Sequence, residues 1–184
     1  MTNSTPFHTA QWISSENAME SHWFRRRFEV QDGHGEVVQA QLLATALGVY
    51  EIYLDGGHAD EALLSPGWST YESRLRYQAY DVTSALSSDS RTHTLAAVTG
   101  NGWYAGHLGF SGMSQVYGDE TALIAELWIT YEDGHQQIVA TDTEWQTRPS
   151  HILYNDLYKG ETIDARHGDT LSSSTFDHDE AADT

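Results

Sequence analysis

Short stretches in which apolar and polar residues alternate recur along the chain, and turns rich in glycine and aspartate separate them. In the segment 23–30, Phe24, Phe28 and Val30 fall on one face and charged residues fall mainly on the other, which is the pattern of a half-buried β-strand. Similar alternation, or a short apolar run in one case, predicts strands at 38–44, 47–54, 76–82, 94–99, 121–131 and 137–141, with last strands beginning at Trp145 and Ile152. No segment keeps a helical period beyond a turn or two, and a capped helical turn is expected at 81–86. Many short strands joined by turns indicate an all-β sandwich.

Two turns and two side chains make this prediction more specific. Asp55-Gly56 and Asp133-Gly134 predict hairpins, because glycine reaches positive φ without a Cβ clash. Arg26 falls on the apolar face of its strand, so it needs a carboxylate or carbonyl partner, or a place at the rim of the sheet. Val38 is expected on the inward face of the next strand.

Composition supports a folded domain and narrows its partners. The chain has 184 residues with six Trp and ten Tyr, which is enough for one domain with a substantial core. Nine basic residues against 27 acidic ones give a formal charge of −18, which repels nucleic acid phosphates and anionic membranes. We therefore expect neither nucleic acid nor a membrane as a partner, while a neutral ligand or a cation is compatible with this charge.

The chain is predicted to form one β-sandwich domain at residues 11–167. Residues 1–10 are polar and are expected to be flexible, and residues 168–184 have the composition of an acidic linker or tail. The start of the chain lacks the basic and apolar regions of a secretory signal, and no apolar run reaches membrane-spanning length. A cytoplasmic location is the resulting expectation.

Catalytic and metal motifs are weak in this sequence. There is no cysteine, which excludes disulfides and thiolate metal sites. Ten histidines are scattered with no pair at i, i+2 or i, i+4 spacing, so no zinc site is expected. A serine–histidine–aspartate triad has no Gly-x-Ser-x-Gly segment to support it.

An ordered set of motifs spans most of the chain from Trp12 to Arg166. It consists of Trp12-Ile13, ALGVYEIYLDG, LSPGW followed by Tyr71 and Arg74, RYQAYDVT, GNGWYAGHLG, YGDETALIAEL, TDTEW and YKGETIDAR. This set resembles the β-sandwich domain near the N-terminus of bacterial α-L-rhamnosidases. The resemblance implies a single jelly-roll, galactose-binding-like β-sandwich.

The resemblance also implies what the chain does not do. In that family, inverting hydrolysis of a terminal L-rhamnose uses a carboxylate acid and a carboxylate base in a later helical-barrel domain. The acidic Trp-Thr-Gly-Asp-like segment of that domain does not occur here. We therefore expect a non-catalytic accessory domain that packs on the catalytic helical-barrel domain of the same parent chain.

The alternative is an autonomous carbohydrate-binding module for L-rhamnose or rhamnosides. Some sandwich domains that resemble this one use a calcium ion, and the matching positions are Asp55 and Asn101. Trp68, Trp103 and Tyr104 offer flat aromatic faces for a sugar ring. The other reading makes Asp55 a turn residue, Asn101 a loop residue and the aromatic side chains core or inter-domain packing. An exposed apolar patch near the two tryptophans would favour the accessory-domain reading.

Overall fold

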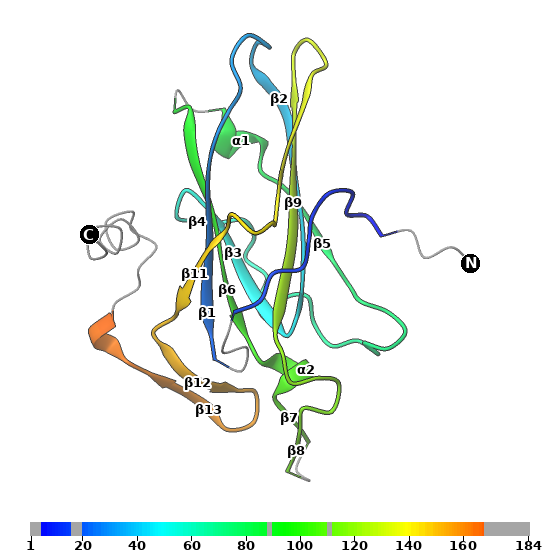
Figure 1. Ribbon diagram of the computed structural model, residues 1–184, viewed down its shortest axis with the longest axis vertical. Coiled ribbons are helices and arrows are strands. Elements are labelled where there is room, and N and C mark those ends of the chain that lie inside the picture. The colour runs from blue at the N-terminus through cyan, green and yellow to red at the C-terminus, as the bar shows by residue number, and fades with distance from the viewer. Residues whose placement is uncertain (1–4, 16–19, 88–89, 110–111, 168–184) are drawn as a thin grey trace.

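Two antiparallel β-sheets face each other in the computed structural model, which describes residues 5–15, 20–87, 90–109 and 112–167 (Figure 1). One sheet has five strands in the order β11-β1-β6-β3-β4, and the other has four in the order β10-β9-β2-β5. The strands are β1 His22–Glu29, β2 Val37–Leu47, β3 Val49–Leu54, β4 Gly57–His58, β5 Gln78–Asp81, β6 Thr92–Gly100, β7 His107–Leu108, β8 Met113–Ser114, β9 Ala122–Tyr131, β10 Gln136–Ala140, β11 Gln146–Pro149, β12 Ile152–Asp156 and β13 Gly160–Ile163. The short helices are α1 Thr83–Leu86, α2 Gly102–Ala105 and the 3-10 turn η1 Ala165–His167. The all-β sandwich expected from the alternating pattern is confirmed.

The core lies between the two sheets because alternate side chains of each strand point inward. Fully buried side chains from β2, β6 and β9 form its centre, namely Leu42, Leu95, Leu123, Leu127 and Ile129. None of the helices in the described ranges is long and apolar enough to cross a membrane.

The predicted turn at Asp55-Gly56 joins β3 to β4. Asp55 has φ +51° and Gly56 has φ +80°, the pair of positive angles that a two-residue hairpin of this hand requires. Leu54 pairs with Gly57 across the turn. The turn therefore depends on glycine at the second position and on the tolerance of aspartate for the left-handed region at the first.

Arg26 and Val38 show where the alternation holds and where it fails. Nη2 of Arg26 lies 2.6 Å from Oε2 of Glu144, so the arginine on the apolar face has the carboxylate partner that it needs. Val38 was predicted to face inward, but it is 53% exposed. The β2–β9 register shifts between Val37 and Gln39, and this bulge turns Val38 outward.

Residues 7–10 pack on the outer face of the four-stranded sheet, although the whole segment 1–10 was expected to be flexible. Phe7 is buried against Leu43 and Ile124. The composition of this segment gives no sign of the contact, because the apolar surface that receives Phe7 belongs to strands far along the chain. The predicted linker at 168–184 lies outside the described residues.

A small subassembly extends beyond one end of the sandwich. It consists of α2, the β7–β8 ribbon and the β12–β13 hairpin, and it lies at the lower end of Figure 1. Both two-stranded ribbons are separate from the main sheets. This end of the molecule contains three of the five residues that the sequence singles out as contacts, and it is joined to the sandwich through the end of β6.

Candidate functional site

Asp55 uses both oxygens of its carboxylate inside the domain. Oδ1 accepts a hydrogen bond of 2.7 Å from the backbone N–H of Thr94, and Oδ2 lies 2.6 Å from Nδ1 of the buried His93. These bonds tie the β3–β4 turn to the start of β6. The structure therefore gives Asp55 a local role in the turn, independent of any ligand.

Asn101 lies at the opposite end of the same strand pair. It is 5% exposed, follows Gly100 at the end of β6, and immediately precedes α2. β3 pairs with β6 from Val49, opposite Gly100, to Leu54, so the six residues of β3 separate Asn101 from Asp55. At about 3.3 Å per residue the two side chains are roughly 20 Å apart and cannot share one calcium ion. Across the described parts of the chain, no cluster of three or more His, Asp or Glu side chains is placed to hold a metal ion.

Trp68 and Tyr104, by contrast, belong to one aromatic cluster that also contains Tyr71 and Tyr117. The Tyr71 ring makes an edge contact with Tyr104 at 5.1 Å between centroids and packs on Tyr117 at 4.9 Å. Nε1 of Trp68 donates to the Tyr117 hydroxyl at 3.3 Å. The cluster joins the loop after Pro66 to α2 and to the segment that follows β8. Tyr117 is the member that sequence reasoning missed, because the irregular loop around it gives no periodic signal.

Burial affects the phenol at the centre of this cluster. Burial, with the neighbouring Tyr117 and Tyr104 hydroxyls, raises the pKa of Tyr71 to about 12. Tyr71 therefore stays neutral near physiological pH and acts as a packing residue. Trp68 is 52% exposed, while Trp103 in α2 is half-buried. Only part of the apolar patch expected near the two tryptophans is thus open to solvent.

Beside the aromatic cluster is a hollow of about 290 Å³, here called the arginine hollow. Its lining residues are Trp68, Ser69, Thr70, Arg74, Arg76 and Tyr117. The turn that carries them is closed by hydrogen bonds from the Arg74 N–H to the Thr70 carbonyl, 2.8 Å, and from the Ser69 hydroxyl to the Arg74 carbonyl, 2.5 Å. The hollow thus combines aromatic faces with two guanidinium groups on one fixed loop.

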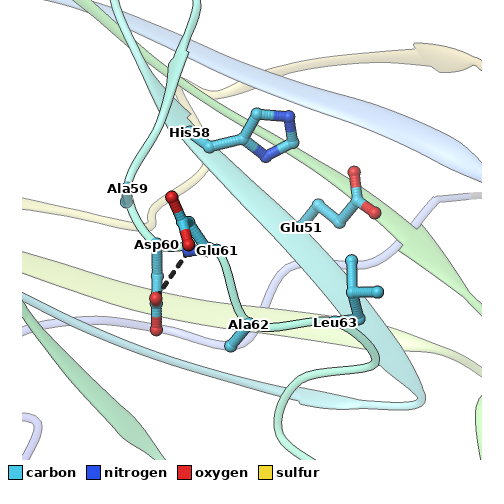
Figure 2. A pocket seen from close by; sticks show the side chains of 7 residues that line it. All are labelled: Glu51, His58, Ala59, Asp60, Glu61, Ala62 and Leu63. Atoms are coloured by element: carbon cyan, nitrogen blue, oxygen red, sulfur yellow. Dashed lines mark hydrogen bonds between the residues drawn. The ribbon is translucent and has the colours of Figure 1, made fainter.

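A second, wider hollow of about 610 Å³ lies over β3 and the segment that follows β4 (Figure 2). Its three carboxylates belong to Glu51, Asp60 and Glu61. Figure 2 shows them spread around the hollow rather than converging on one point. Glu51 accepts a 2.5 Å hydrogen bond from the Tyr53 hydroxyl, and Asp60 accepts one from the N–H of Glu61.

The β12–β13 hairpin is attached to the sandwich through polar groups of β12. Asp156 is buried, and its carboxylate accepts hydrogen bonds from the N–H groups of His107, Tyr158 and Lys159 and lies 2.8 Å from Nδ1 of His107. Burial alone would raise the pKa of Asp156, but these hydrogen bonds outweigh it and lower the pKa to about 2. The carboxylate is therefore ionised at neutral pH and fixes the start of β7 to the hairpin.

Four apolar side chains of this hairpin and of the turn that joins its strands are open to solvent. The exposed fractions are 58% for Leu153, 41% for Tyr154, 48% for Tyr158 and 53% for Ile163. Buried polar residues next to exposed apolar ones reverse the usual distribution in a surface ribbon. This surface, here called the hairpin surface, is defined by these four residues.

The chain is similar to known proteins in both sequence and structure. A family model described as the alpha-L-rhamnosidase N-terminal domain matches residues 35–184. An alpha-L-rhamnosidase of Streptomyces avermitilis is 41% identical over 140 residues, which cover 76% of this chain and 13% of that protein. The solved structure of a Streptomyces avermitilis alpha-L-rhamnosidase complexed with L-rhamnose has a TM-score of 0.75 and 39% identity over 82% of this chain and 14% of its own.

A native alpha-L-rhamnosidase structure from Aspergillus terreus superimposes with a TM-score of 0.81 and 30% identity over 87% of this chain and 19% of its own. The chain therefore spans less than a fifth of the length of these relatives. The family match covers most of the chain and includes every residue of the aromatic cluster, the arginine hollow and the hairpin surface. The chain belongs to the alpha-L-rhamnosidase N-terminal domain family.

Proposed function

We propose that this chain is the non-catalytic accessory β-sandwich of an enzyme that hydrolyses terminal α-L-rhamnosides. The proposal extends the family membership to an activity of the parent protein, whose relatives are more than four times as long as this chain. The domain packs on a helical-barrel catalytic domain of the same chain. That domain supplies the carboxylate acid and the carboxylate base for an inverting reaction.

The observation that carries this proposal is the hairpin surface. A two-stranded ribbon outside a larger sheet is marginally stable alone, and exposed apolar groups on it lower its solubility further. A second domain that covers the hairpin surface removes the apolar side chains of Leu153, Tyr154, Tyr158 and Ile163 from water, which is favourable. The buried Asn155 and Asp156 already hold the ribbon in place. The hairpin surface is therefore the contact that the catalytic domain covers.

Hydrogen exchange tests this contact in the parent enzyme and in the 184-residue chain. We expect the backbone amides of β12 and β13 to exchange at least about tenfold more slowly in the parent, because a covered ribbon opens less often. Amides of β9, which lie in the four-stranded sheet in both proteins, provide the internal reference. Equal exchange of the hairpin in the two proteins would refute the contact.

Turnover of an aryl α-L-rhamnoside tests the non-catalytic role. The 184-residue chain should show none under conditions in which the parent enzyme is active. Hydrolysis by the isolated chain would contradict the proposal.

An autonomous rhamnose-binding module is the second candidate, and the half-exposed face of Trp68 favours it. In this case L-rhamnose contacts Trp68 and Tyr104, and calcium, if it takes part, binds at Asp55 or at Asn101 but not at both. Calorimetric titration with L-rhamnose, with and without calcium, separates the candidates. Heat of binding that Trp68→Ala abolishes would support the module, and no heat at millimolar sugar would exclude it.

A further inference from the structure

Two arginines stand out because the chain is so acidic. Only nine of its 184 residues are basic, against 27 acidic ones. Carboxylates pair with Arg26, Arg91 and Arg166. In contrast, none of the ion pairs within the described ranges includes Arg74 or Arg76, although both line the arginine hollow. The chain has three acidic residues for every basic one, and yet two guanidinium groups on one hollow have no carboxylate partner among the described residues. This indicates a binding site for an anionic ligand.

The backbone of both arginines is held in place. The Thr45 hydroxyl donates a 2.5 Å hydrogen bond to the Arg76 carbonyl, and Ser69 and Thr70 hold the peptide groups of Arg74. Thr45 itself is buried in β2. The Arg76 guanidinium lies close to Gly67, with Nη1 3.8 Å from where a Cβ of that residue would be. Arg76 and Trp68, the residue after Gly67, line the same hollow.

The wall of the hollow is aromatic and polar. Trp68 presents an exposed indole face, and its N–H is used by the Tyr117 hydroxyl, so the ring is held from the side. The volume of about 290 Å³ is close to the lower end of small-molecule sites, about 300 Å³. The loop 67–76 contains one carboxylate, Glu72, and it is not among the residues that line the hollow. The hollow thus offers a flat apolar face beside two hydrogen-bonding cations.

We propose that the arginine hollow binds an acidic saccharide. The carboxylate of a uronic acid pairs with the guanidinium groups of Arg74 and Arg76, whose planar donor pairs fit the two oxygens of a carboxylate. The sugar ring lies against the face of Trp68. The recognition of an anion rests on the arginines alone. The choice of a saccharide rests on the proposed function, in which the parent enzyme acts on carbohydrate.

Sodium D-glucuronate is the probe, with D-glucose and sodium acetate as half-ligands that keep only the ring or only the carboxylate. Binding to the 184-residue chain is followed by ¹H–¹⁵N NMR through the Trp68 indole N–H and the arginine Nε–H signals. We expect millimolar binding of glucuronate and at least about tenfold weaker binding of each half-ligand, because each makes only part of the contact. Shifts should be confined to the loop 67–76 and to Tyr117.

Substitutions locate the site. Arg74→Ala and Arg76→Ala should each weaken glucuronate binding about tenfold, and Arg76→Lys should also weaken it because lysine lacks the planar fork. Arg27→Ala is the matched control, since Arg27 is an exposed arginine of β1 that does not line the hollow, and it should leave binding unchanged. All the side chains to be changed are exposed, so urea midpoints should match that of the wild type.

Three results would overturn the proposal. Absence of shifts with glucuronate would exclude the site. Equal binding of glucose would exclude the role of the arginines, and equal binding of acetate would exclude the saccharide. Failure of the proposed function gives a different result, namely unchanged hydrogen exchange of β12 and β13 in the parent enzyme.

Discussion

Asn101 and Asn155 connect the sandwich to the β12–β13 hairpin through two hydrogen bonds. The backbone N–H of Asn101 donates to Oδ1 of Asn155 at 2.7 Å, and Nδ2 of Asn101 donates to the backbone carbonyl of Asn155 at 3.1 Å. Both residues are buried. A side chain would not fit at the preceding Gly100, because a Cβ there would lie 2.9 Å from the same Oδ1. The Gly-Asn-Gly segment is therefore a joint between β6, α2 and the hairpin.

Asn155→Ala should detach one side of this joint. The buried N–H of Asn101 would lose its acceptor, which costs about 1 to 3 kcal/mol of unfolding free energy. The loss should be in the lower part of this range, because Nδ2 of Asn155 has no partner in the described structure and its removal relieves a buried polar group. Urea unfolding measures the change, and amides of β12 and β13 should exchange faster. The exposed Thr162→Ala in β13 is the control and should stay within about 0.5 kcal/mol of the wild type.

Asp156 should make the stability depend on pH in the acid range. Its pKa in the folded chain is about 2, below the ordinary 3.8, so the carboxylate stabilises the fold fully above about pH 4 and loses this contribution as the pH falls towards 2. A shift of this size corresponds to about 2 kcal/mol. Urea unfolding between pH 2 and 6 should show a smaller pH dependence for Asp156→Asn, by about that amount. Identical slopes would mean that the carboxylate gains nothing from its N–H partners.

Glu126 holds the N-terminal segment on the outer face of the four-stranded sheet. Its fully buried carboxylate accepts hydrogen bonds from the N–H groups of His8, Thr9 and Ala10, from the Thr9 hydroxyl and from the indole N–H of Trp128. Burial raises the pKa of this carboxyl, but the hydrogen bonds from residues 8–10 together outweigh burial, so the pKa lies below its ordinary value. Three successive backbone amides thus take the place of a cation.

Glu126→Gln should therefore destabilise the fold by about 2 to 3 kcal/mol at neutral pH, because an amide nitrogen would face the N–H donors and the charge would be lost. The difference from wild type should shrink as the pH falls through the lowered pKa of Glu126, since the wild-type carboxylate is then protonated. Urea unfolding measures both effects, and limited proteolysis should cut the variant earlier near residue 10. Glu29→Gln, an exposed change in β1, should leave stability and cleavage unchanged.

The strands were predictable because each sheet buries one face. Burial of one face makes apolar and polar residues alternate along the sequence of each strand. Segment 121–131 and β9 agree to within one residue for this reason. The contacts of Asn101 and Glu126 were not predictable in this way. The partner of Asn101 is 54 residues away, and the N-terminal donors to Glu126 are more than 110 residues away, so nothing in the neighbouring sequence reveals them.

The candidate site was also predictable only in part. The sequence singled out Trp68 and Tyr104 by residue type, and the structure joins them through Tyr71 and Tyr117. It also singled out Asp55 and Asn101 together, but the pairing of β3 with β6 places them at opposite ends of one strand pair. Residue type indicates what a side chain can contact, whereas strand register decides which side chains meet.

Gly118→Ala should disturb the aromatic cluster without changing a polar group. A Cβ at position 118 would lie 2.5 Å from Cζ and 2.6 Å from Cε1 of Tyr104, and a ring cannot yield as a flexible side chain does. Tyr104 must therefore move away from Tyr71, and such overpacking costs about 1 to 3 kcal/mol. Urea unfolding gives the cost, and the near-ultraviolet circular dichroism of the tyrosines should change. Gly57→Ala is the matched control, because its Cβ would make only an ordinary contact of 3.5 Å with the Leu54 carbonyl oxygen. If both variants were equally stable, the Tyr104 ring would have to be mobile, and the loop that carries Tyr117 would not be a fixed wall for the arginine hollow.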